Sequence, residues 1–136
     1  MTNILMIETH GRSATAITDK IDAIIATSGK QSGLAHLFIQ HTSASLLIQE
    51  NADPDVLRDL IDWFDRIAPE NGLYRHTAEG PDDMPAHLKS AVTSTSLTIP
   101  FENKRLLLGV WQDVYILEHR KAPYTRRIIV TLIEAA

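Results

Sequence analysis

The 136-residue sequence predicts an α+β domain in which helices pack on one side of a mainly antiparallel sheet. Three observations predict this class. Apolar runs of strand length stand near both ends of the chain, and the stretch between Asp53 and Pro69 has apolar residues at helical spacing. The strand-like runs of the last third are joined by short turns, which favours antiparallel pairing. The length fits one domain, so we expect residues 1–136 to fold as a single unit.

The first part of the chain is expected to hold a strand, a helix and a long extended stretch. Residues 4–9 (ILMIET) are strand-like. Thr18 has the features of a helix N-cap, and Gly29 is a fitting helix end. The apolar stretch 34–50 would reach about 55 Å if it were straight, at ~3.3 Å per residue, which is too long for one strand. We therefore expect it to bend at the polar run 41–45 (HTSAS).

The middle of the chain predicts two helices separated by a long loop. A helix with Asp53 as its N-cap, followed by a proline, is expected to run to about Ile67. Residues 68–84 are rich in Pro, Gly, Asn and Asp, and a loop this long in a small domain is more often functional than a plain connection. A short helix over 84–91 should follow, with Asp83 as its N-cap.

The last third predicts strands over 95–101 and 126–134, and between them a strand pair or one bent strand over 105–119. Because short turns join them, we expect an antiparallel meander. Trp111 follows Gly109 in the middle of an apolar run, and its side chain is expected in the core.

Composition excludes several classes of function. The chain has no cysteine, so disulfides and cysteine-based zinc sites are excluded. The net charge of −4 lacks the basic excess typical of nucleic-acid-binding proteins. The N-terminus does not resemble a signal peptide, and no apolar run approaches the roughly 20 residues of a membrane span. We expect a cytoplasmic protein that binds neither nucleic acid nor membranes. Walker, Rossmann and GxSxG motifs do not occur.

Three histidines are candidates for a functional site, and each also has an ordinary structural explanation. In an extended chain His41 and Ser43 share one face, which is either a solvated strand corner or a surface for an anion or metal. His87 lies four residues after Asp83, so on a helix both can face the same way; the alternative is a capped surface helix with a solvated histidine. His76 lies in the long loop, where it is either part of a site or an exposed loop histidine without a role.

These histidines are candidate metal ligands. Three imidazoles with nearby carboxylates suit a divalent ion, zinc or magnesium, and catalytic zinc sites commonly use three protein ligands and leave one position open. We therefore expect His41, His76 and His87 to bind the ion, although no diagnostic spacing such as HExxH is present. The same side chains could instead serve as general acid and base.

A basic cluster near the C-terminus is a second candidate. Arg120, Lys121, Arg126 and Arg127 surround a predicted turn, which is either a solvated turn or a clamp for a phosphate or carboxylate. Asn51, with Glu50 beside it, either contacts a ligand or forms hydrogen bonds that link the end of the predicted strand to the start of the helix after Asp53.

Several motifs together resemble the YjbQ-like family, whose members are often labelled secondary thiamine-phosphate synthase enzymes. They are HTSASLLIQENADPDV, NGLYRH, GPDDMPAHLKS, TSLTIP, LLLGVWQDVYILEHR and RRIIVTL, and they cover the chain from about residue 34 to its end. The resemblance implies a YjbQ-like α+β fold and a homotrimer.

The resemblance also implies a site that contains the histidines named above. Carried over by position, its residues are His41, His76, His87, Asp82, Asp83, Glu50, Asn51, Gln112, Glu118 and Arg127. This sequence departs from the family pattern at two places. The turn 102–104 lacks the usual glycine, and Asp113 adds a carboxylate after the WQ pair, which could alter the choice of ligand.

Three hypotheses follow. The first is a transferase with weak thiamine-phosphate synthase activity, which joins a pyrimidine diphosphate to a thiazole phosphate. It would use His41, His76, His87, Asp83 and Glu118 as catalytic residues, and Ser43, Asn51, Gln112, Arg120 and Arg127 to bind the phosphorylated ligand. The second is a non-catalytic trimeric module that binds a metal or a small phosphorylated ligand. The third assigns the histidines to packing at a subunit interface.

Overall fold

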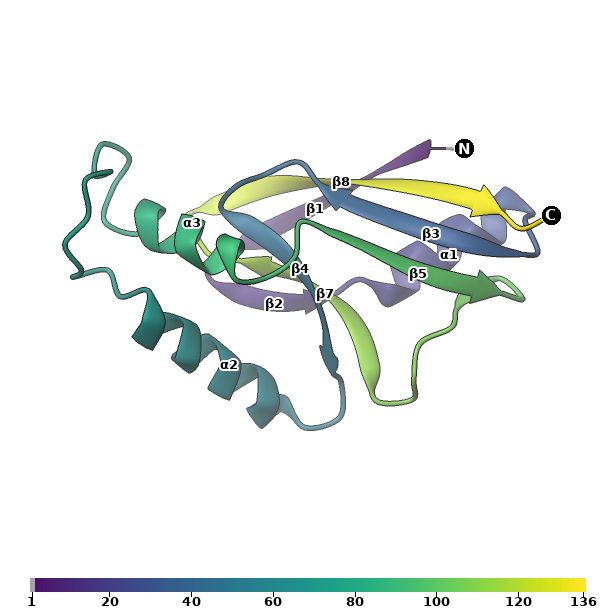
Figure 1. Ribbon diagram of the computed structural model, residues 1–136, viewed down its shortest axis with the longest axis horizontal. Helices are drawn as coiled ribbons and strands as arrows, with labels where there is room; N and C mark the ends of the chain where they lie inside the picture. The colour runs from purple at the N-terminus through teal and green to yellow at the C-terminus, as the bar shows by residue number, and fades with distance from the viewer. Residues whose placement is uncertain (1) are drawn as a thin grey trace.

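The computed structural model describes residues 2–136 and contains three helices among mainly antiparallel strands (Figure 1). This confirms the predicted α+β class. Among the described residues, no helix has the length and apolar character needed to span a bilayer. In chain order the elements are β1 (Thr2–His10), β2 (Ser13–Ala16), α1 (Thr18–Ser28), β3 (Ser32–Ile39), β4 (Ala44–Glu50), α2 (Pro54–Ile67), α3 (Asp83–Ala91), β5 (Ser96–Glu102), β6 (Arg105–Leu106), β7 (Gln112–Glu118) and β8 (Pro123–Glu134).

The strands form two sheets. One has five strands in the order β1-β8-β3-β5-β6, and the other has three in the order β2-β7-β4. Every strand pair in both sheets is antiparallel. The predicted C-terminal meander is therefore wrong, because β7 pairs with β2 and β4 while β8 pairs with β1 and β3. Turn length predicts pairing between neighbours in sequence, whereas here the chain crosses between sheets after β6 and again after β7.

The main core lies between the two sheets and α1. Its members come from α1 and from β1 and β3–β8, and include Ile21, Ile25, Leu37, Leu46, Ile116 and Ile128, each at most 1% exposed. A second cluster lies on the other face of β7, where Tyr115 and Leu117 pack against Phe64 of α2. Strand β7 is thus covered on both faces, which explains its continuous apolar run.

The capping residues of two helices were predicted from the sequence, two of them correctly and one not. Asp53 is the N-cap of α2, and its Oδ1 accepts a hydrogen bond of 2.9 Å from the Asp55 amide. Gly29 ends α1 in the left-handed conformation, with φ of 74°. Thr18 is the first residue of α1 rather than its N-cap; its hydroxyl accepts a 2.9 Å hydrogen bond from the Val114 amide of the neighbouring strand. A tertiary partner has therefore replaced the expected cap.

The stretch 34–50 breaks where the polar run predicted, with β3 ending at Ile39 and β4 beginning at Ala44. The prediction for Trp111 is wrong, since its side chain is 62% exposed. The residues between β6 and β7 form no strand; Leu107 and Val110 are exposed like Trp111, and Leu108 is half-buried against the main core.

Candidate functional site

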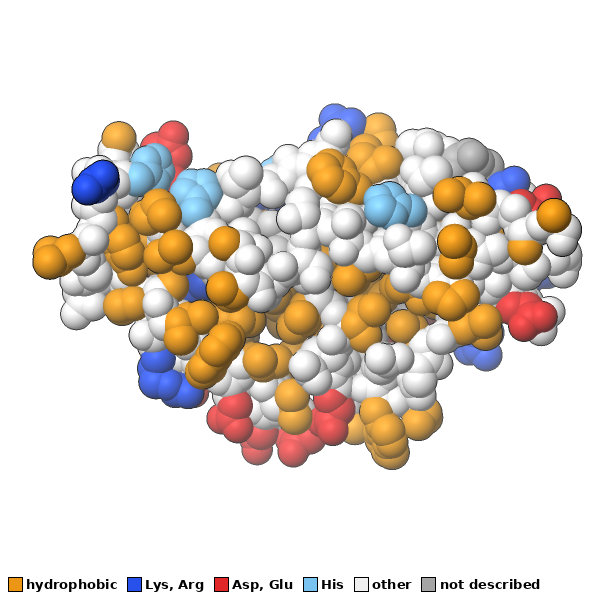
Figure 2. All heavy atoms as spheres, in the orientation of Figure 1, with side chains coloured by type: hydrophobic (Ala, Val, Ile, Leu, Met, Phe, Trp, Pro, Cys, Tyr) orange, Lys and Arg blue, Asp and Glu red, His pale blue; other side chains and the backbone are white. Residues whose placement is uncertain are grey.

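The first turn of α3 and the loop before it bring two histidines to one carboxylate. The Asp83 side chain is 2% exposed, and its Oδ2 lies 3.0 Å from Nε2 of His87, one helical turn further on. His76, from the preceding loop, places its Nε2 2.6 Å from the same oxygen. One ligand atom from each residue can be chosen so that all three lie within 4.8 Å of one another. Histidines are visible at the surface over α3 in Figure 2.

The helix begins one residue earlier than the sequence indicated. Asp82 is the N-cap and makes no side-chain capping bond, so the prediction of Asp83 as N-cap is wrong. The Asp82 carboxylate instead accepts hydrogen bonds from the main-chain amide of Lys121 and from Arg120. Asp83 is thus the first residue of the helix, and its four-residue spacing from His87 puts both side chains on one face.

Arg120 holds both aspartates in place. Its Nη1 lies 2.8 Å from Asp83 Oδ1, and its Nε lies 3.0 Å from Asp82 Oδ2. A third nitrogen donates to the main-chain oxygen of Glu79 in the loop, at 3.0 Å. The guanidinium is therefore engaged by groups of the site itself, and Arg120 acts here as a positioning residue.

The electrostatics keep Asp83 ionised. Burial by itself would raise the pKa of this carboxyl, but the hydrogen bond from His76 and the charges of His87 and Arg120 outweigh it, so the pKa lies below the ordinary value. The carboxylate is thus a charged acceptor at neutral pH, with one oxygen bound to Arg120 and the other facing the two imidazoles.

His87 also ties α3 to the connection between β3 and β4. Its Nδ1 lies 2.8 Å from the carbonyl oxygen of Thr42. Since a carbonyl only accepts hydrogen bonds, Nδ1 carries the proton. A metal-bound histidine typically donates its second ring N–H to such a carbonyl or to a carboxylate, which fixes the ring orientation.

His41 lies in the same connection but outside the group of ligand atoms around Asp83. Its Nε2 accepts a 2.8 Å hydrogen bond from the main-chain amide of Arg127 on β8, and its Nδ1 is 3.4 Å from a guanidinium nitrogen of Arg126. Burial and the Arg126 charge lower the pKa of His41. In this arrangement two donors face the ring, so His41 does not share the role of His76 and His87.

Glu118 and Ser43, two further candidates, belong to a buried ion pair. Arg126 donates from Nε to Glu118 Oε1 at 2.7 Å and from Nη2 to the Ser43 hydroxyl at 3.1 Å. Burial would raise the pKa of Glu118, but hydrogen bonds from Arg126 and Thr9 outweigh it and hold the pKa low. The Glu118 side chain is fully buried, which indicates a structural role.

Asn51 and Gln112 lie at the opposite end of the three-stranded sheet. Ala44 pairs with Glu118 at one end of the β4–β7 ladder, and Glu50 pairs with Gln112 at the other. Six residues of strand separate the ends, roughly 20 Å. Asn51 Nδ2 donates to the main-chain oxygens of Val110 and Gln112, so within one chain the structure does not bring these residues to the histidine cluster.

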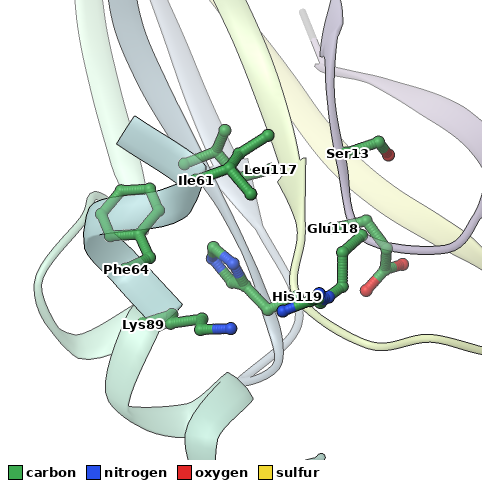
Figure 3. A pocket seen from close by; sticks show the side chains of 8 residues that line it. Ser13, Ile61, Phe64, Lys89, Leu117, Glu118 and His119 are labelled. Atoms are coloured by element: carbon green, nitrogen blue, oxygen red, sulfur yellow. The ribbon is translucent and has the colours of Figure 1, made fainter. Parts of the chain in front are cut away.

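The sequence reasoning missed a buried histidine. His119 follows β7 and is 4% exposed; its Nε2 lies 2.8 Å from the Ser45 hydroxyl, which accepts from Thr93. Figure 3 shows its ring among Phe64 and Lys89 and the other side chains of a small pocket. Burial and the Lys89 charge lower its pKa to about 4. The sequence feature that could have revealed its burial is the continuous apolar run of β7, which predicts that both faces of this strand are buried.

Two hollows flank the histidine cluster. One, of about 420 Å³, is formed by the loop and includes His76, Leu73 and Tyr74. The other, of about 260 Å³, includes His41 and His87 and lies between α3 and the β3–β4 connection. The cluster therefore stands beside space that a small molecule can enter.

The fold and the cluster define a small two-sheet α+β domain that carries a histidine–aspartate site at the start of a helix. Residues 3–135 match the family described as UPF0047 protein YjbQ-like, and the chain belongs to this family. A UPF0047 protein of Synechocystis is 54% identical over 93% of this chain and 87% of its own length. YjbQ of Escherichia coli is 43% identical and covers 94% of each chain.

Solved structures show the same fold. An uncharacterised YjbQ/UPF0047 protein of Clostridium acetobutylicum superposes with a TM-score of 0.89 at 35% identity, over 96% of this chain and 99% of that one. A conserved hypothetical protein of Thermus thermophilus gives 0.87 at 36% identity, with the same coverage. None of these names states a reaction or a ligand.

Proposed function

We propose that the protein binds a divalent metal ion at His76, Asp83 and His87 and uses it to bind the phosphate of a small phosphorylated molecule. The observation that carries the proposal is the convergence of two imidazoles on one buried carboxylate, with their ligand atoms within 4.8 Å. Three protein ligands with an open fourth position are typical of catalytic zinc sites.

The donor set fits zinc better than magnesium. Magnesium prefers oxygen ligands and retains several waters, whereas imidazole suits zinc. The surrounding contacts also fit a metal site. The His87 Nδ1–H donates to the Thr42 carbonyl, and Asp83 Oδ1 accepts from Arg120. Such contacts orient metal ligands and typically contribute 10–100-fold to metal affinity.

A bound cation would supply the charge needed for a phosphate. Arg120 is paired with Asp82 and Asp83, and Arg126 with buried Glu118. These two guanidinium groups are thus engaged by carboxylates of the chain, which favours the metal rather than an arginine clamp as the main phosphate-binding group.

The metal site is tested by titrating metal-free protein with zinc in a calorimeter. We expect one zinc per chain, and a loss of at least ~100-fold in affinity for His76→Gln and for His87→Gln. His36→Gln is the matched control, because His36 lies on β3 and bonds Thr98. Equal zinc affinity in all four proteins would overturn the proposal.

For the reaction, we propose the transferase chemistry named by the family resemblance. The thiazole nitrogen attacks the pyrimidine methylene carbon, the carbon–oxygen bond to diphosphate breaks, and diphosphate leaves. Diphosphate needs its charge neutralised as it departs. Zinc-loaded protein given both precursors should form thiamine phosphate and diphosphate in equal amounts, and His87→Gln should form neither. Zinc and phosphate binding without turnover would favour the non-catalytic alternative.

We also propose that the chain assembles as a homotrimer through the outer face of the five-stranded sheet. Strand register places Ile4 opposite Ile129, and Ile129 opposite Phe38. Directly opposed residues share a face of the sheet. Apolar side chains gather over this sheet in Figure 2, and those at least 42% exposed are Ile4, Met6, Leu34, Phe38 and Ile133.

Analytical ultracentrifugation tests the assembly. The wild-type protein should sediment at three chain masses, and Met6→Lys with Phe38→Lys should release monomers. Leu73→Lys is the control, since Leu73 is a fully exposed apolar residue on the loop before α3. A wild-type monomer would contradict the proposal.

A further inference from the structure

The hollow beside His87 has walls of regular structure. It is lined by His41, Thr42, Ala44, His87, Ser90, Ala91 and Thr95, and its volume is about 260 Å³. These residues come from α3, from the segment after it, and from the β3–β4 connection with the start of β4. The His87–Thr42 hydrogen bond of 2.8 Å links two of these parts. The walls are therefore set by the fold.

His87 belongs both to this hollow and to the proposed metal site. Its Nε2 faces Asp83 Oδ2 at 3.0 Å, while its ring is part of the wall. A molecule in the hollow therefore lies against one of the metal ligands. Only the His87 imidazole would then separate that molecule from the cation, so its anionic group could reach the metal.

The lining carries no Asp, Glu, Lys or Arg side chain. Its titratable groups are His87, the proposed metal ligand, and His41, which accepts a hydrogen bond from the Arg127 amide and faces Arg126 at 3.4 Å. Two donors beside the His41 ring oppose its protonation, so that side of the wall carries no charge. A charged group placed against that side would lose water without gaining a counter-charge, which is unfavourable.

One polar group of the lining is unused. The Ser90 Oγ is buried and has no hydrogen-bond partner among residues 2–136. Buried hydroxyls usually have partners, and an exception calls for an explanation. Because the Oγ has almost no exposed surface, a ligand atom in the hollow supplies the missing partner only when the Ser90 side chain turns towards it.

We infer that this hollow holds the uncharged part of the phosphorylated ligand, a small ring or chain with a hydrogen-bonding atom for Ser90. The inference rests on the proposed metal site, where the phosphate of the same molecule binds. The cation thus recognises the phosphate, and the hollow selects the group attached to it.

The test compares two probes, inorganic phosphate and phenyl phosphate, on protein that carries one zinc per chain and no free zinc. Calorimetry should show phenyl phosphate binding at least ~10-fold tighter, since a buried ring removes apolar surface from water. Ala91→Leu, at an exposed wall position, should remove this difference and leave the affinities for zinc and inorganic phosphate unchanged. Thr95→Leu fills the hollow from the other wall and should act in the same way.

Ala23→Leu is the matched control, an exposed alanine within α1 and outside the hollow. It should bind both probes as the wild type does. If zinc and inorganic phosphate bind but phenyl phosphate binds no tighter, or if both filling variants keep the preference, this inference is overturned and the metal proposal stands. If zinc does not bind, the metal proposal is wrong and this inference falls with it.

Discussion

His87 holds both of its ring nitrogens against acceptors: Nδ1 lies 2.8 Å from the Thr42 carbonyl, and Nε2 lies 3.0 Å from Asp83 Oδ2. His41, from the same β3–β4 connection, has the opposite environment, with donors at both nitrogens. The two histidines look alike in the sequence. Their surroundings suit His87 to the proposed metal site and leave His41 outside it.

Arg120→Met should weaken both the fold and the site. It removes the partner of two largely buried carboxylates, and breaking a buried pair by removing one member typically costs about 3–5 kcal/mol. Zinc affinity of the protein that remains folded should fall about 10–100-fold. Urea denaturation and calorimetry measure the two effects.

Arg58→Met is the control for Arg120→Met. Arg58 pairs with Asp55 on the surface of α2, where the side chains are 72% and 70% exposed. Its loss should change the free energy of unfolding by no more than about 0.5 kcal/mol. Equal effects of the two substitutions would contradict the role assigned to Arg120.

His119 should make the protein less stable as the pH falls. Its pKa is lowered from 6.5 to about 4, so between these values the unfolded chain binds a proton that the folded protein does not. The stabilisation is complete above pH 6.5 and lost as the pH approaches 4. At 1.36 kcal/mol per pKa unit the loss is at most about 3 kcal/mol.

His119→Gln should flatten this pH dependence of the unfolding free energy. His41 has a lowered pKa as well, so the wild type and the variant must be compared over the same pH range. Denaturation at steps between pH 7 and pH 4.5 provides the comparison. Parallel curves for the two proteins would show that His119 does not titrate as the structure implies.

Two serine-to-alanine substitutions should differ in their effect on the free energy of unfolding. The Ser90 hydroxyl is buried without a partner, so Ser90→Ala should leave the unfolding free energy unchanged or raise it by up to about 1 kcal/mol. Ser45 bonds both His119 and Thr93, so Ser45→Ala should lower it by about 1–3 kcal/mol. Thermal and urea unfolding measure both. A larger loss for Ser90→Ala than for Ser45→Ala would refute the assigned contacts.

Glu118→Gln distinguishes a catalytic from a structural role for Glu118. The carboxylate is fully buried against Arg126, so neutralising it should destabilise the fold by about 3–5 kcal/mol. At low temperature, where the variant remains folded, zinc affinity should equal that of the wild type. A stable variant that has lost turnover would restore the catalytic interpretation suggested by the family resemblance.

Local patterns were informative wherever neighbours in the sequence decide the structure. The amphipathic helix after Asp53, the break after Ile39 and the shared face of Asp83 and His87 were all predicted from spacing and capping residues. The N-cap of α3 was misplaced by one residue: it is Asp82, whose carboxylate bonds Lys121 and Arg120 instead of capping the helix.

The sequence by itself determined the α+β class, the helix positions and the presence of histidines near acids. Only the tertiary structure decided that β7 and β8 lie in different sheets, that His76 joins Asp83 while His41 does not, and that His119 and Glu118 are buried. The physical reason is the range of the forces involved. Capping and periodicity act within one or two turns, whereas the Thr9–Glu118 hydrogen bond joins residues 109 positions apart. Strand pairing and burial depend on such distant partners.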